Sequence, residues 1–168
     1  CVTSIGKSAF ENCDSLRAVD FPQGLETIEY GMFFNSGLET FEIPEGVVRL
    51  GDRAFMGCSS LKEVTIPDSV TSIGYSPFYG CDKLAEINVS ENNNLFSSIN
   101  GVLFNKDKST LIRYPYSKVG TTYTIPSSVT EIGEYAFYWN DFIRSVVIPE
   151  SVKKISAYSF YDCDNILS

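Results

Sequence analysis

Short stretches in which apolar and polar residues alternate recur along the chain, and most of them stop at a proline. Typical copies are VDFP at 19–22, VTIP at 64–67 and YTIP at 123–126. Alternation over three residues predicts a short strand with two side chains turned inward. Proline ends such a strand because it cannot donate the next hydrogen bond of the ladder. We expect strands centred near these residues: Asp20, Glu42, Thr65, Asn88, Arg113, Thr124 and Val147.

A second pattern follows the strands in a fixed register: an aliphatic residue, then glycine, and a phenylalanine five positions after the aliphatic residue, usually preceded by alanine. It starts at Ile5, Leu50, Ile73 and Ile132, with weaker copies at Ile28 and Ile155. In chain order the start positions differ by 23, 22, 23, 59 and 23, so the period is 23 with one deletion and one insertion. A single unit cannot bury its apolar positions, whereas stacked copies can. We therefore expect 1–168 to form one repeat solenoid of the leucine-rich-repeat type. It should be right-handed, with a parallel sheet on the concave side and short helical turns opposite.

The long step between the copies at Ile73 and Ile132 contains structure of its own. Residues 96–99 and 102–104 flank Asn100-Gly101, a pair that favours the type I′ turn of a β-hairpin. Residues 111–115 resemble another strand that ends in proline. We interpret 91–122 as an irregular repeat that carries a β-hairpin, part of a small β-meander, as an insertion.

Two segments, IPDSVTSIG at 66–74 and IPSSVTEIG at 125–133, resemble the BspA-type leucine-rich repeat, which also occurs in treponemal surface antigens. The insertion from Gly101 to Pro115 resembles a segment that recurs in such proteins. The resemblance covers essentially the whole chain. It implies a bacterial or protozoan cell-surface or secreted protein that takes part in adhesion, with host matrix proteins or other cell-surface proteins as partners.

The chain opens at the equivalent of Ser69, in the middle of a repeat, so we expect it to be a fragment of a longer array. A lipid-modified Cys1 is the alternative. Solenoids need capped ends, because a terminal repeat otherwise exposes its core. At the C-terminal end the exposed set should comprise Val146, Ile148, Val152, Ile155 and Phe160.

Charge and composition narrow the function. The 168 residues hold 13 Lys and Arg against 21 Asp and Glu, a net charge of −8, which disfavours nucleic-acid binding. Histidine is absent, which excludes catalytic triads and metal sites that use it. No apolar run is long enough for a transmembrane helix, so this segment should not insert into a membrane.

Four cysteines, Cys13, Cys58, Cys81 and Cys163, occupy the same repeat position. Register-equivalent side chains in neighbouring turns point in parallel, which aims them poorly for a disulfide. No close pair has the spacing of a metal site. We expect reduced, buried thiols, no metal and no cofactor.

The outward strand positions form a candidate binding face on the concave side. Its members are Asp20, Glu42, Glu63, Thr65, Glu86, Asn88, Arg113, Thr122, Thr124 and Ser145. The plainer alternative is a solvated polar face. Its carboxylates could also bind Ca²⁺, or act as the paired acids of a glycosidase, but no acid is singled out by an apolar pocket.

Aromatic residues are abundant, with 12 Phe, 10 Tyr and one Trp. One Phe per repeat should form a core ladder. Tyrosines before and after it form a candidate aromatic surface for sugar rings or a partner protein, with plain packing as the alternative: Tyr30, Tyr75, Tyr79, Tyr135, Tyr138 and Tyr158.

The chain lacks a nucleophile–base pair, a phosphate loop and a metal cluster, so we do not expect an enzyme. The leading hypothesis is a non-catalytic module for protein–protein interaction, because solenoids offer extended surfaces to large ligands. The alternatives are a glycan-binding module that uses exposed tyrosines, and a structural spacer.

Overall fold

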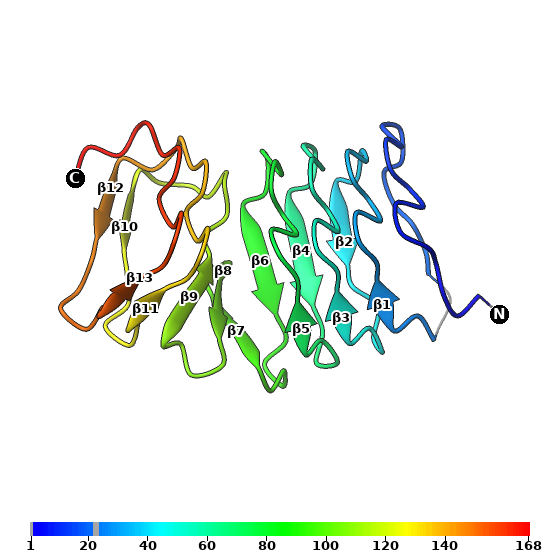
Figure 1. Cartoon of the computed structure of the whole chain (residues 1–168), viewed down its shortest axis with the longest axis horizontal. Helices are drawn as coiled ribbons and strands as arrows, with labels where there is room; N and C mark the ends of the chain where they lie inside the picture. The colour runs from blue at the N-terminus through cyan, green and yellow to red at the C-terminus, as the bar shows by residue number, and fades with distance from the viewer. Residues whose placement is uncertain (1, 22–23) are drawn as a thin grey trace. The chain divides into compact units, whose positions relative to one another are not determined.

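The structure, a computed structural model, describes residues 2–21 and 24–168. Its regular elements are all short β-strands, and no helix forms in these residues (Figure 1). The chain divides into two compact units, and each is described by itself. The first consists of Cys1–Leu84 with Val89–Asn94, and the second of Ala85–Asn88 with Leu95–Ser168.

Each full repeat of the first unit contributes two short strands, which join two different parallel sheets. One sheet has the order β1 (Thr27–Ile28), β3 (Arg49–Leu50) and β5 (Ser72–Ile73). The other pairs β2 (Thr40–Glu42) with β4 (Glu63–Ile66). The sequence pattern predicts only the second kind of strand, because an element of two residues is too short to show alternation.

The strands expected near Glu42 and Thr65 are confirmed, and both end before the prolines at 44 and 67. The strand expected near Asp20 is wrong, since residues 19–21 form no strand in the described part. One backbone hydrogen bond, from Glu39 N–H to the Arg17 carbonyl at 3.4 Å, connects this stretch to the next turn. The proline expected to end that strand, Pro22, lies outside the described residues, as does Cys1.

The Ala-Phe segments form successive tight turns in place of the expected helical turns. The reason is a left-handed backbone at two positions four residues apart, as at Gly31 and Asn35 (φ 56° and 54°). Arg53 and Gly57 repeat the pair in the next turn, with φ of 56° and 74°. A right-handed helix cannot continue through such residues.

These turns also explain how the segment is bonded without a helix. Alternate N–H groups donate to the adjoining repeat, as Phe33 does to the Ala54 carbonyl at 2.8 Å. The groups between them donate three residues back, as Phe34 does to Gly31 at 2.9 Å. Every second amide therefore links one repeat to the next.

The deletion that shortens one repeat by a single position lies at Gly37. A Cβ built there would lie 2.0 Å from the Asp14 carbonyl oxygen, so only glycine fits. Arg17 occupies the same corner, with Nη1 donating to the carbonyls of Asp14 and Gly37 at 2.6 and 3.1 Å.

The predicted phenylalanine ladder forms the core of the first unit. The rings of Phe10, Phe33, Phe55 and Phe78 stack in succession, with centroids 5.4, 5.3 and 5.7 Å apart. Phe41 packs against two of these rings from the strand side. Aromatic stacking adds to the hydrophobic gain of burying each ring.

The second unit begins with β6 (Glu86–Val89), whose last residue belongs to the first unit, and continues into a hairpin. Strands β7 (Phe96–Ile99) and β8 (Val102–Asn105) pair antiparallel through a turn at Asn100 and Gly101, which have φ of 49° and 75°. Both left-handed values are those of the expected type I′ turn. Ile87 donates its N–H to the Gly101 carbonyl at 2.9 Å.

The third meander strand, β9 (Thr110–Arg113), pairs antiparallel with β8 but parallel with β11 (Glu131–Ile132). The sheet order is β13 (Lys154–Ile155), β11, β9, β8 and β7. The sequence predicts a strand near Arg113 in line with those near Thr124 and Val147. That alignment is wrong, because β9 pairs with β11, a strand of the same kind as β3 and β5, whereas β10 (Thr122–Thr124) pairs with β12 (Ser145–Val147).

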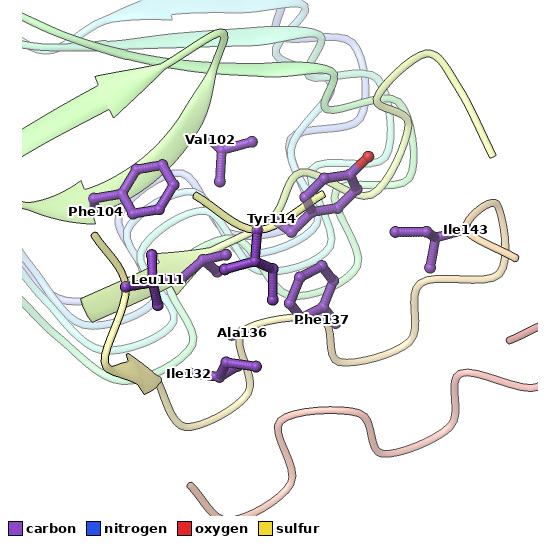
Figure 2. Packing of buried hydrophobic residues seen from close by; sticks show 10 residues of the cluster. Val102, Phe104, Leu111, Tyr114, Ile132, Ala136, Phe137 and Ile143 are labelled. Carbon is purple, nitrogen blue, oxygen red and sulfur yellow. The ribbon is translucent and has the colours of Figure 1, made fainter. Parts of the chain in front are cut away.

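Tyr114 follows β9 and takes the place of a ladder phenylalanine. Its ring stacks on Phe137 at 5.0 Å, and its N–H donates to the Ala136 carbonyl at 2.8 Å. Figure 2 shows both rings within the hydrophobic cluster to which Leu111 and Ile132 also belong. Tyr114 is buried and therefore serves as a core ring, and this burial raises the pKa of its hydroxyl.

Candidate functional site

The outward side chains of β2 and β4 form a polar row, which we call the strand face. Glu42 lies beside Thr65, and Thr40 lies beside Glu63. Each carboxylate therefore has a threonine as its cross-strand neighbour, and the two acids sit on a diagonal. Within the described residues, no group of three or more Cys, Asp and Glu side chains is placed to share a metal ion.

In the second unit the outward side chains of β10 and β12 form a separate, uncharged row. Thr122 lies beside Ser145, and Thr124 lies beside Val147. The Ser145 hydroxyl is 3.2 Å from the hydroxyl of Ser168. This pair of strands offers hydroxyl groups to a ligand.

The other predicted members of this face lie elsewhere or are tied to each other. Arg113 belongs to the other sheet, where its Nη1 donates to the Tyr135 carbonyl at 2.7 Å. On β6, the amide of Asn88 donates to Glu86 Oε2 at 3.3 Å. Asp20 is exposed but lies outside any strand.

The candidate tyrosines occupy more than one register position. Tyr30 and Tyr75 directly precede the first left-handed residue of their turns, whereas Tyr135 and Tyr158 are that residue, with φ of 59° and 57°. The four tyrosines that precede the phenylalanine therefore do not form the single column that equivalent repeat positions would give. Tyr79 and Tyr138 both follow the ladder phenylalanine by one residue, as expected.

Three of the predicted rings join a larger cluster in the second unit. Tyr135 stacks on Tyr158 at 5.1 Å, and Tyr138 packs edge-on against Tyr135 at 5.2 Å. Tyr161 stacks on Tyr138 at 5.5 Å, and Trp139 stacks on the same ring at 6.3 Å. We call these five residues the aromatic surface. The sequence analysis does not include Tyr161 or Trp139 among its candidates. The signals that could have found them are that Tyr161 lies one repeat after Tyr138 and that Trp139 directly follows Tyr138.

The cysteines combine burial with a hydrogen bond that the sequence did not reveal. Cys58 and Cys81 are buried, as predicted, while Cys13 and Cys163 are only partly buried, so for these two the prediction of buried thiols is wrong. All four are free thiols. Cys58 Sγ donates to the Phe33 carbonyl at 3.0 Å, which marks the position as a donor to the preceding turn.

A polar hollow of about 510 Å³ opens in the first unit where the shortened repeat turns. Arg17, Asn35 and Ser59 contribute to its lining. The Asn35 amide donates to Asn12 Oδ1 at 3.2 Å across its edge. In the sequence, the feature that marks this hollow is the one-residue deletion beside Gly37.

The predicted exposed apolar set in the last repeat is accessible in part. Ile148 and Ile155 are 43 % and 52 % exposed, while Val146, Val152 and Phe160 are half-buried. An apolar hollow of about 340 Å³ lies among Val146, Ile148 and Phe160.

Among the described residues, none belongs to a helix of the length and apolar character needed to cross a bilayer.

Solved structures of bacterial leucine-rich repeat proteins resemble this chain. A leucine-rich repeat protein from Eubacterium ventriosum is 33 % identical with a TM-score of 0.85, covering 95 % of this chain and 42 % of that one. The pneumococcal vaccine antigen PcpA is 30 % identical with a TM-score of 0.73, over 88 % of this chain and 43 % of the antigen. A leucine rich cell surface protein from Faecalibacterium prausnitzii is 25 % identical with a TM-score of 0.62, over 98 % and 57 %.

The chain thus spans less than half the length of the first two structures. No match was found among curated proteins. The family model described as the BspA type leucine rich repeat region matches in six copies, over residues 1–110 and 114–168. This chain belongs to the BspA-type leucine-rich repeat family.

Proposed function

We propose that this chain is a non-catalytic binding module of a bacterial cell-surface or secreted protein, and that it contacts other proteins through its strand face. This proposal rests mainly on the geometry of β2 and β4. Phe41 and Val64 are buried beneath the row while Glu42 and Thr65 stand outward side by side. Parallel strands repeat such rows at about 4.8 Å.

A broad polar row of this kind suits a protein ligand better than a small molecule. Small-molecule sites are concave and mostly apolar, whereas protein interfaces accept flat surfaces with hydrogen-bonding rims. The resemblance to a leucine rich cell surface protein and to a vaccine antigen supports the placement at the surface. Adhesion to host matrix proteins or to neighbouring bacteria is the role that follows from this placement.

The test is a binding assay of the protein against a panel of matrix proteins and a panel of bacterial cells. Glu42→Arg combined with Thr65→Arg should abolish a detected interaction, because the two changes replace adjacent polar side chains of the strand face with long cationic ones. Glu45→Arg, an exposed change beyond Pro44, is the matched control. Absence of any ligand in both panels would remove the adhesion proposal. Binding that survives the double change would move the interaction away from this face, and binding to a glycan array alone would replace the protein partner.

A further inference from the structure

We infer that the aromatic surface of the second unit binds arginine side chains of a partner protein segment. This goes beyond the strand face, because Tyr135, Tyr138, Trp139, Tyr158 and Tyr161 all lie on the tight turns. The turns carry these rings in two successive repeats, so Tyr158 and Tyr161 hold the places of Tyr135 and Tyr138 one full period later.

The rings are ordered before any ligand arrives. Tyr135 and Tyr158 stack at 5.1 Å with planes 15° apart, and Tyr158 meets Tyr161 edge-on at 5.7 Å. The indole Nε1–H of Trp139 donates to Asp162 Oδ2 at 2.6 Å, which fixes the orientation of that ring. Rings held in this way lose little conformational freedom on binding, so less of the interaction free energy is lost to ordering.

The same rings remain accessible. Trp139, Tyr158 and Tyr161 are 43 %, 53 % and 49 % exposed. Exposed aromatic clusters of this kind are enriched in binding surfaces, since each ring combines a large apolar area with a polar edge.

The charged residues near the rings indicate which kind of ligand would bind there. The two turn segments, 133–143 and 155–168, contain Glu134, Asp141, Asp162 and Asp164 but no Lys or Arg. All four carboxylates are exposed. A cationic group is thus attracted both by the carboxylates and by the negative faces of the rings.

Three basic residues of this unit have partners within the chain, and one of them, Lys154, pairs with Glu131 at 2.7 Å. Arg113 donates to the Tyr135 carbonyl at 2.7 Å, and Lys118 donates to the Asn100 carbonyl. Both partners are backbone oxygens.

The first unit shows how an arginine can meet a tyrosine of these turns. There Arg53 Nη1–H donates to the Tyr30 hydroxyl at 3.2 Å. Arginine is the preferred occupant in the second unit because its planar guanidinium stacks on a ring while its N–H groups pair with a carboxylate.

The experiment uses three labelled peptides of equal length, in which glycine alternates with arginine, lysine or glutamate. Trp139 is the only tryptophan in the chain, so its fluorescence reports on the site directly. We expect saturable binding of the arginine peptide with a change in this emission, about two- to fivefold weaker binding of the lysine peptide, and none of the glutamate peptide.

Variants locate the contact. Tyr158→Ala with Tyr161→Ala should weaken arginine-peptide binding about tenfold, and Asp162→Asn about threefold, measured by peptide anisotropy. Asp162→Asn keeps all five rings, so it tests the site even if the double change disturbs folding. Tyr30→Ala with Tyr75→Ala is the matched control in the first unit and should change nothing.

Three results would overturn the inference: no emission change at saturating peptide, equal loss with the first-unit control, or binding of neutral glycans in place of the arginine peptide. The proposed adhesive function is tested separately, because it depends on Glu42 and Thr65. A failure here with intact matrix-protein binding would leave that function standing.

Discussion

At the position three residues after each ladder ring, the chain places a group that can donate a hydrogen bond. Thiols do this at Cys58, Cys81 and Cys163, which reach the carbonyls of Phe33, Phe55 and Phe137 at 3.0, 3.2 and 3.0 Å. The interpretation of these cysteines as small apolar residues describes their burial but not this bond. What the residues share is a donor of suitable reach, and a pattern of residue names does not display it.

Asn140 occupies the same position and tests that view. Its amide donates to the Pro115 carbonyl at 3.1 Å, and its Oδ1 accepts the Ile143 N–H at 3.0 Å. Asn140→Ala leaves two buried backbone groups unpaired, so the free energy of unfolding should fall by about 2 kcal/mol.

Urea unfolding followed by circular dichroism measures this change. Asn165→Ala, which removes an exposed bond to the Asp141 carbonyl, is the control and should cost under about 0.5 kcal/mol. Equal effects of the two substitutions would show that the buried donor is dispensable.

Thiol reactivity is a second test at this scale. Burial raises the pKa of Cys58, so less of it is thiolate at a given pH, and its sulfur is also inaccessible. A maleimide probe followed by peptide mass spectrometry should label Cys58 and Cys81 at least about a hundredfold more slowly than the denatured chain. Cys13, which is partly exposed, should be labelled first. Fast labelling of Cys58 would contradict the packing.

At the scale of the element, the glycine that follows β3, β5 or β11 is required by the close approach of the neighbouring turn. A Cβ on Gly51 would lie 2.8 Å from the Ile28 carbonyl oxygen, and one on Gly133 would lie 2.8 Å from that of Leu111. Both contacts are with backbone, which cannot move aside as a side chain can. The motif of an aliphatic residue followed by glycine thus records a close approach of two backbones.

Gly51→Ala should therefore lower the free energy of unfolding by about 2 kcal/mol or more, by overpacking against fixed backbone. Gly6 has the same place in its repeat, but a Cβ added there would meet no atom within 4 Å, so Gly6→Ala is the matched control and should cost little. Thermal unfolding of both variants decides the matter. A similar loss of stability in both variants would show that the cost comes from the backbone conformation of glycine and not from a steric contact of the added Cβ.

The pairing of β11 with β13 includes a charged contact that depends on pH. Lys154 Nζ and Ser156 Oγ donate to Glu131 Oε1 at 2.7 and 2.8 Å, and these bonds hold the pKa of Glu131 below its usual value. A carboxyl with a lowered pKa in the folded state stabilises above its unfolded pKa, and this stabilisation is lost as the pH falls through the folded value.

Glu131→Gln should accordingly flatten the decline of stability between about pH 5 and about pH 3 relative to the parent protein. Urea midpoints across this range measure it, with the exposed Glu134→Gln as control. A parallel decline in parent and variant would exclude Glu131 as a source of the acid sensitivity.

At the scale of the whole molecule, the regular period of the repeat made two features predictable: the core, and the strands that precede the prolines, such as β2, β4 and β10. Phe55 and Phe137 repeat in register, and a residue that repeats in a solenoid packs on its own copies. The left-handed turns were not predictable, because Arg53 and Tyr135 adopt positive φ without being glycine. The register of β9 was also hidden, since a hairpin reverses the chain before Leu111 rejoins the stack. Of the candidate site, the rows on β2 with β4 and on β10 with β12 came together as pairs, whereas Arg113 did not.

Phe55→Ala and Phe137→Ala form a matched pair of cavities, one in each unit. Each should cost about 3–5 kcal/mol, because a fully buried ring is lost from a stacked ladder. Hydrogen exchange should accelerate most in the repeats that contact the cavity, since contacts in a repeat array are between neighbours. Uniform acceleration through both units after either change would show a single cooperative unfolding unit.

The bonding of the tight turns has an evolutionary consequence. The N–H of Phe33 binds the carbonyl of Ala54, and the N–H of Phe55 binds that of Pro77, so donor and acceptor hold equivalent places in successive copies. Duplicating or losing a whole copy by unequal recombination recreates the same bonds at the new junction. Array length can therefore change among descendants without a new fold being selected, whereas a gain or loss within a copy must be repaired locally, as glycine does at position 37.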